Sequence, residues 1–167
     1  MEKIKKILAP TDFSELSQVG VRYALNLAKG FGAEVTLYHV VSYEELVHYG
    51  ETMKEDSVGS ITFHPRDSVL EKYQLALHRF LEERFSDLIR SVKILEMVEL
   101  GTPDLNIVEQ AKKDGADLIV ISTHGRSGLS HMLLGSVTEK VVRHAPCPVL
   151  SIPPQREQKA SQKAVAG

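Results

Sequence analysis

Residues 117–122 read Asp-Leu-Ile-Val-Ile-Ser, a short apolar run that predicts a β-strand buried on both faces. Before it, Gly101-Thr102-Pro103 predicts a helix start, with the threonine as N-cap and the proline in the first turn. After it, a loop containing glycines leads to a second helix near Gly135-Ser136, and Val149–Ile152 predicts a last strand. Strands and helices therefore alternate around this run.

The alternation continues toward the N-terminus. Short β-rich runs predict strands over 3–9, 34–41 and 91–99, and apolar residues at helical spacing predict helices over 16–28 and 67–90. This order predicts an α/β fold in which helices cover both faces of a parallel sheet, with right-handed crossovers. We expect one domain over residues 1–152 and a disordered tail over 153–167.

The segment 42–66 shows no clear hydrophobic period and is predicted to be a long inserted loop that could hold one short helix. Its first part is strongly acidic and has a single lysine, Lys54; the acidic residues are Glu44, Glu45, Glu51, Glu55 and Asp56. A solvated loop is the simplest interpretation. A lid over a ligand and an arm that binds a partner are the alternatives.

Composition limits the class of protein. The 167 residues are 43% hydrophobic and 25% charged, which is typical of a globular domain and excludes a collagen or a chain disordered throughout. No apolar run is long enough for a transmembrane helix, and the charged N-terminus has no signal-peptide core. The single cysteine excludes an internal disulfide, and the net charge of −2 argues against nucleic-acid and membrane partners. We expect a cytoplasmic protein.

In an open α/β sheet, ligands bind at the carboxyl ends of the strands. Residues 10–12, 40–41 and 122–136 should meet there. Gly125 and Gly128 allow a tight turn, Arg126 could bind an anion, and the helix that begins at Gly135-Ser136 offers free N–H groups to a phosphate. The alternative is an ordinary surface turn with Ser136 as N-cap. Neither a P-loop nor a Gly-x-Gly-x-x-Gly motif is present.

The chain contains Ser122-Thr-His-Gly125, then nine residues, then Gly135-Ser136. This pattern resembles the ATP-binding signature of the universal stress protein family. That signature is Gly, two residues, Gly, nine residues, Gly and then Ser or Thr. Similar matches cover about residues 3–152 in order; they are Ile7-Leu-Ala-Pro-Thr-Asp12, His39-Val-Val41, Gly101-Thr-Pro103 and Ala145-Pro-Cys-Pro-Val149. The resemblance implies a Rossmann-like sheet of five strands in the order 3-2-1-4-5. One position departs from the signature, because Ser122 replaces its first glycine.

The resemblance also implies which residues bind ATP or another adenylate. Those near the base and ribose are Pro10, Thr11, Asp12, Val40, Ile121 and Ser122, and those near the phosphates are Gly125, Arg126, Gly128, Gly135, Ser136, Val137 and Thr138. Mg²⁺ or Mn²⁺ would be held through phosphate oxygens and not in a protein cage. We identified no catalytic residue and no residue that binds a metal directly.

The resemblance further implies a stress-response sensor or regulator that forms a homodimer through the last strand, near Val149, Leu150 and Ile152, and acts on an unidentified regulatory protein. At most slow ATP hydrolysis is expected, because no strong base or arginine finger is evident. Two alternatives remain open: a dimeric scaffold of the same fold that binds no nucleotide, which Ser122 favours, and a transferase that uses Asp12, His124 or Arg126.

Overall fold

The computed structural model describes residues 3–56, 65–124 and 134–153. Five parallel strands form one sheet in the order β3-β2-β1-β4-β5, which confirms the order expected from the resemblance. The strands are β1 (Lys6–Pro10), β2 (Glu34–Val41), β3 (Lys93–Leu100), β4 (Leu118–Ser122) and β5 (Val149–Ile152). The order reverses beside β1, so the carboxyl ends of β1 and β4 border the crevice where a ligand would bind.

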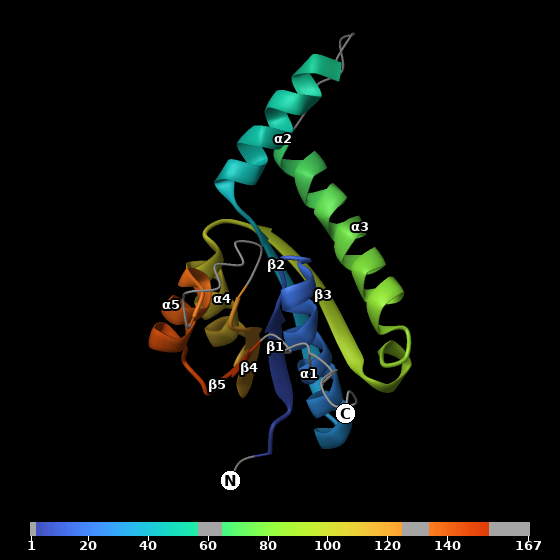
Figure 1. The fold of residues 1–167 in the computed structure, drawn as a ribbon, viewed down its shortest axis with the longest axis vertical. Coiled ribbons are helices and arrows are strands. Elements are labelled where there is room, and N and C mark those ends of the chain that lie inside the picture. The colour runs from blue at the N-terminus through green and yellow to red at the C-terminus, as the bar shows by residue number, and fades with distance from the viewer. Residues whose placement is uncertain (1–2, 57–64, 125–133, 154–167) are drawn as a thin grey trace, which may run out of the picture.

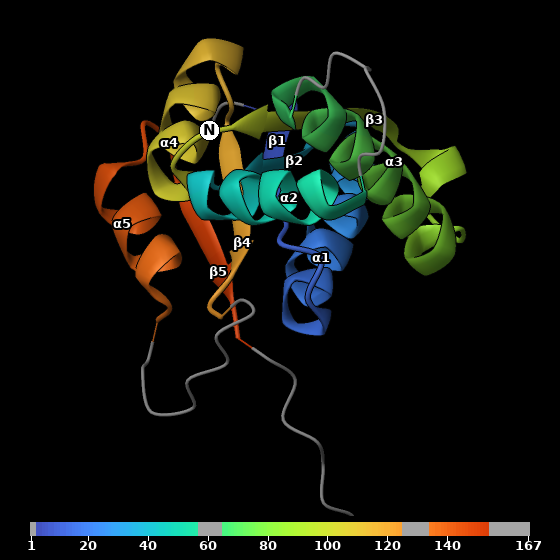
Figure 2. The ribbon, with the colours of Figure 1, turned by 90° about the horizontal axis from the view of Figure 1, so that it is seen from above.

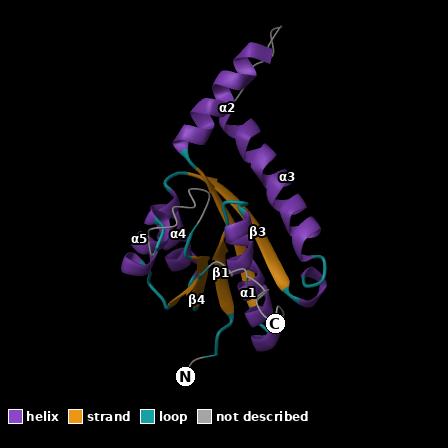
Figure 3. Ribbon diagram, viewed as in Figure 1, coloured by secondary structure: helices purple, strands orange, loops and turns teal. Residues whose placement is uncertain are grey.

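Helices cover both faces of the sheet, as the alternating pattern predicted (Figures 1 and 3). The helices are α1 (Glu15–Phe31), α2 (Tyr43–Asp56), α3 (Pro65–Phe85), α4 (Pro103–Asp114) and α5 (Ser136–His144), with a short 3-10 turn η1 (Ile89–Ser91) before β3. Figure 2 shows α1 and α3 on one side of the sheet and α4 and α5 on the other. Among the described residues, no helix is long and apolar enough to cross a bilayer.

The core has two halves, one on each face of the sheet. Successive residues of β1 alternate between them, because side chains of a strand point to opposite faces: Ile7 and Ala9 pack with α1 and α3, while Leu8 packs with α4 and α5. Burial of both faces explains why these strands read as continuous apolar runs. Helix α1 ends at Gly32, whose φ of 65° suits a residue without a side chain.

The segment 42–66 was predicted to be a loop that could hold one short helix; its first part forms the 14-residue helix α2. Ser42 and Glu45 make a capping box: Ser42 Oγ accepts from the N–H of Glu45 at 3.2 Å, and Glu45 Oε2 accepts from the N–H of Ser42 at 2.8 Å. The spacing Ser-x-x-Glu was visible in the sequence, but an exposed helix lacks the apolar period that usually reveals one. Figure 1 shows α2 rising away from the carboxyl edge of the sheet, beside the start of α3.

Other boundaries moved by a few residues. Helix α3 begins at Pro65 and ends at Phe85, earlier than the predicted 67–90. Thr102 occupies the N-cap position of α4 as predicted, but its side chain makes no capping bond; instead Asn106 Oδ1 accepts from the N–H of Thr102 at 2.9 Å. The predicted disorder of the tail concerns residues that, from 154 onward, lie outside the described part of the chain.

Candidate nucleotide site

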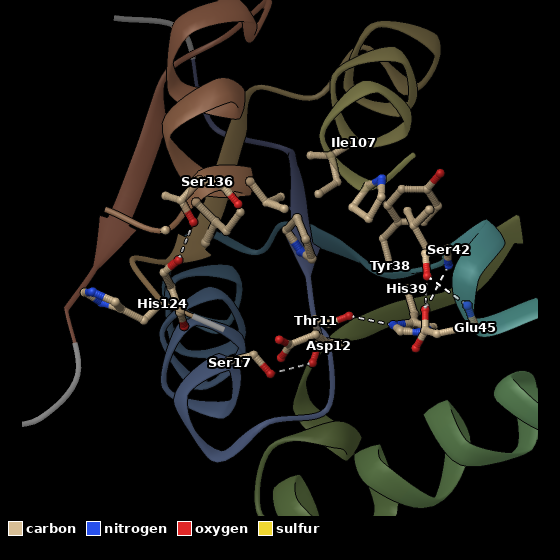
Figure 4. A pocket seen from close by; sticks show the side chains of 18 of the residues that line it. Thr11, Asp12, Ser17, Tyr38, His39, Ser42, Glu45, Ile107, His124 and Ser136 are labelled. Carbon is tan, nitrogen blue, oxygen red and sulfur yellow. Dashed lines mark hydrogen bonds between the residues drawn. The ribbon is translucent and has the colours of Figure 1, made fainter. Parts of the chain in front are cut away.

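A cavity of about 390 Å³ opens at the carboxyl edge of the sheet, a size within the usual range for small-molecule sites. Figure 4 shows Ser136 and His124 on one side of it, Ser42 and Glu45 on the opposite side, and Thr11 and Asp12 between them. Five segments supply the walls: the β1–α1 loop, the end of β2 with the start of α2, the start of α4, the end of β4 and the start of α5.

The cavity brings together the residues that the sequence analysis selected, so far as they are described. Its walls include Pro10, Thr11, Asp12, Val40, Ile121, Ser122, Gly135, Ser136, Val137 and Thr138. Gly125, Arg126 and Gly128 lie outside the described residues. The nucleotide site expected from the sequence did not include several other lining residues: Ser17, Tyr38, His39, Ser42, Glu44, Glu45, Pro103, Ile107 and His124, of which His124 was named only for the transferase alternative. Most of these come from the starts of helices that face the same sheet edge.

The β1–α1 loop is held by short-range hydrogen bonds. Thr11 Oγ1 accepts from the N–H of Phe13 at 3.1 Å and lies 2.9 Å from the hydroxyl of Ser17. Asp12 Oδ1 accepts from both the N–H and the hydroxyl of Ser14, at 3.1 and 2.6 Å. Ser14 in turn caps α1 by accepting from the N–H of Ser17. Asp12 therefore orients the capping residue and does not cap the helix itself.

His39 is a buried residue that lines the cavity, and the sequence analysis named it only within the matched run His39-Val-Val41. Its Nδ1 lies 2.8 Å from the carbonyl oxygen of Thr11. A carbonyl can only accept, so Nδ1 carries the hydrogen and donates it. The ring also packs against Phe13, with centroids 4.3 Å apart, and against Tyr73 of α3 at 5.0 Å. His39 thus fixes the loop that precedes α1 from a strand that is distant in sequence.

Ser122, the departure from the family signature, has its hydroxyl bonded to α1. The hydroxyl donates to the carbonyl of Leu16 at 2.7 Å and accepts from the N–H of Gly20 at 3.1 Å. The carbonyl of Ser122 accepts from the hydroxyl of Thr138 at 2.8 Å. The side chain of Ser122 therefore joins β4 to α1, and the carbonyl joins β4 to the first turn of α5.

Helix α5 points its N-terminus at the cavity. Gly135, not Ser136, occupies the N-cap position, and its N–H donates to the carbonyl of Thr123 at 2.6 Å. The first N–H groups of a helix have no partner within the helix, and no side chain of the described residues caps α5. Ser136 and Val137 therefore present backbone donors at a partially positive helix end, an arrangement that suits an anion.

His124 follows β4 on the same side of the cavity. Its Nδ1 lies 2.9 Å from the hydroxyl oxygen of Thr123. His124 therefore takes part in the hydrogen bonding of this loop.

The model of the universal stress protein family matches residues 3–153. The chain belongs to this family. A universal stress protein of Methanocaldococcus jannaschii, MJ0531, is 38% identical over 149 residues, which cover 89% of this chain and 81% of the relative. The Bacillus subtilis universal stress protein YxiE is 31% identical and is covered over 97% of its length.

Solved structures agree with this assignment. The structure of MJ0577, from the same archaeon, superposes with a TM-score of 0.69 at 30% identity and covers 93% of this chain and 99% of its own. Two more distant universal stress proteins of the same fold, at 20% and 19% identity and with TM-scores of 0.63 and 0.53, were solved with cAMP and with dAMP. Adenine nucleotides are therefore bound in these two relatives.

Proposed function

We propose that this universal stress protein binds an adenine nucleotide, ATP above all, in the cavity at the carboxyl edge of the sheet. The supporting observation is that one cavity joins an apolar wall, formed by Val40, Ile107 and Ile121, to the open N-terminus of α5. A purine stacks well on an apolar wall, and phosphate suits a helix N-terminus. The cAMP and dAMP complexes of distant relatives support the choice of adenine.

A divalent cation, Mg²⁺ or Mn²⁺, would accompany ATP through its phosphate oxygens. Asp12, Glu44 and Glu45 line the cavity, and no lysine or arginine is among its described lining residues. A bound cation would offset the repulsion between these carboxylates and the phosphates. No group of three potential metal-ligating side chains occurs in the described part of the chain, which favours a cation that enters with the nucleotide.

The physiological role that we propose is regulation and not turnover: occupancy of the site would be communicated to a partner protein. The scaffold alternative was based on Ser122. Because the hydroxyl of Ser122 is bonded to α1, this residue gives no reason to prefer that alternative. For the transferase alternative, the Asp12 oxygen described above holds Ser14, and Arg126 lies outside the described residues.

Calorimetric titration with MgATP tests this proposal. Wild type should bind, and Gly135→Val should bind about 30-fold more weakly, because a Cβ at this position would lie 3.2 Å from the carbonyl oxygen of Thr123 and shift the start of α5. Gly30→Val is the matched control, since no atom lies within 4 Å of its Cβ position. A folded wild type that does not bind ATP, AMP or cAMP would refute the nucleotide site.

We also propose the homodimer through β5. This strand lies at the edge of the sheet, and the side chain of Leu150 is 39% exposed there. An apolar edge strand favours pairing with a second copy. Leu150→Asp should convert a dimer into a monomer in analytical ultracentrifugation, whereas the exposed Leu105→Asp on α4 should leave the dimer intact. A monomeric wild type at micromolar concentration would contradict the proposal.

A further inference from the structure

Helix α2 carries two large apolar side chains that the described part of the chain leaves in water. The helix extends away from the sheet and packs chiefly on α3 (Figure 1). Tyr43 is 59% exposed and Val47 is 60% exposed. The two residues are four positions apart, so they lie on the same face of the helix, one turn from each other. Covering this face would remove both side chains from water, which is favourable.

The opposite side of α2 is fixed against α3. Glu45 Oε1 accepts from the hydroxyl of Tyr73 at 3.1 Å, and Lys72 Nζ lies 5.0 Å from the centre of the Tyr49 ring. Successive residues of an α-helix are rotated by about 100°, so Val47 points away from the side that carries Glu45 and Tyr49. The contacts with α3 therefore hold the apolar face outward.

The apolar face is bordered by carboxylates. Glu44 and Glu51 are exposed and fall on the same third of the helix surface as the two apolar residues. Neither carboxylate forms an ion pair or a hydrogen bond with a residue that the structure describes. The side chains of α2 are described from Tyr43 to Thr52, and this stretch has no lysine or arginine; the whole helix has one lysine, Lys54. The face is therefore both apolar and negatively charged.

We propose that the outer face of α2, formed by Tyr43, Glu44, Val47 and Glu51, docks a basic amphipathic helix of a partner protein. Apolar side chains of the partner pack on Tyr43 and Val47. Its lysines or arginines pair with the two carboxylates, as charges beside an apolar seam do in paired helices. The proposal names the chemistry of the partner that the proposed regulatory role requires, and in that respect it rests on the proposed function.

The charges of the outer face disfavour pairing of this face with itself. A symmetric dimer contact brings the same patch of both copies together. Glu44 and Glu51 would then face their own equivalents, and like charges placed against each other at an interface oppose association. The carboxylates therefore select a basic partner and reject both an acidic partner and the outer face of a second copy.

Fluorescence anisotropy with two labelled helical peptides tests the apolar contact. Both peptides have leucines at three- and four-residue spacing; one has lysines beside the leucines, and the other has glutamates at the same positions. Wild type should bind the lysine peptide about tenfold more tightly than the glutamate peptide. The double variant Tyr43→Ser and Val47→Ser should bind the lysine peptide about tenfold more weakly than wild type, because apolar contacts are lost while serine has nearly the same helix propensity.

The control for the apolar contact is Leu75→Ser on α3. Leu75 is 56% exposed, and it lies two residues from Tyr73, so it points away from α2. This variant loses an exposed apolar side chain of the same helical hairpin and should bind the lysine peptide as wild type does.

The same assay tests the charges. The double variant Glu44→Gln and Glu51→Gln should bind the two peptides with affinities within about twofold of each other, and its binding should depend less on salt. The matched control is Glu71→Gln with Glu83→Gln, which removes the same total charge from exposed positions of α3. This control should keep the preference for the lysine peptide.

The outcomes separate this proposal from the nucleotide site. The docking surface would be overturned if wild type did not bind the lysine peptide, if it bound both peptides equally, or if Leu75→Ser lost as much affinity as the double serine variant. A change in the sedimentation of the protein alone, caused by the double serine variant, would assign the outer face to a second copy and overturn the proposal as well. In each case, calorimetric binding of MgATP would leave the nucleotide site standing.

Discussion

Gly20→Val is expected to lower the free energy of unfolding by about 3 kcal/mol. Helix α1 crosses β4 so closely that a Cβ at residue 20 would lie 2.9 Å from the backbone nitrogen of Ser122 and 2.7 Å from its hydroxyl oxygen. A backbone atom cannot turn aside as a side chain can, so α1 and β4 must separate. That separation breaks the hydrogen bond from the N–H of Gly20 to Ser122 Oγ. Urea denaturation followed by circular dichroism measures the loss.

The control for this prediction is Gly30→Val in the last turn of the same helix. Nothing lies within 4 Å of the Cβ position of Gly30, so only the difference in helix propensity remains, a few tenths of a kcal/mol in favour of valine. Equal stabilities of the two variants would show that α1 does not approach β4 as described. Because Ser122 also holds Thr138, Gly20→Val should weaken MgATP binding as well.

Tyr38 is expected to make stability fall at alkaline pH. Its side chain is fully buried, and its hydroxyl donates to Glu99 Oε2 at 2.7 Å. Burial raises the pKa of Tyr38 above its ordinary value, and the hydrogen bond to the Glu99 carboxylate raises this pKa further. The folded state therefore holds the proton more tightly than the unfolded state. The stabilisation is complete below about pH 10 and is lost as the pH rises toward the folded pKa.

Tyr38→Phe removes this titration. Above about pH 10, the free energy of unfolding of wild type should decline relative to Tyr38→Phe by about 1.4 kcal/mol per pH unit, the effect of one proton. At neutral pH the variant should be less stable by about 1 kcal/mol, because Glu99 loses a donor. Tyr23→Phe, at a tyrosine that is 48% exposed, is the control. Parallel curves for wild type and Tyr38→Phe at high pH would contradict the prediction.

Much of the fold could be predicted because buried parallel strands and amphipathic helices leave distinct periods in the sequence. The run 117–122 predicted a strand that is now β4, and Gly135-Ser136 predicted the start of α5. The position of the cavity also followed, since parallel strands bring their carboxyl ends to one edge. The sequence analysis allowed a short helix in this segment but did not place α2, because its exposed surface needs no apolar period; the capping box at Ser42 was the available signal.

Three features could therefore be predicted from the sequence alone, because they depend on local periodicity and on short motifs. They are the order of the elements, the sheet edge at which polar residues meet, and the resemblance to a family. The direction in which each side chain points could not be predicted from the sequence. In the sequence, Ser122 favoured a protein that binds no nucleotide, whereas in the structure its hydroxyl is bonded to α1. Nothing in the sequence showed that His39 bonds to the carbonyl oxygen of Thr11. These partners lie far apart in sequence, and only the packing of helices against the sheet sets which atoms come within hydrogen-bonding distance.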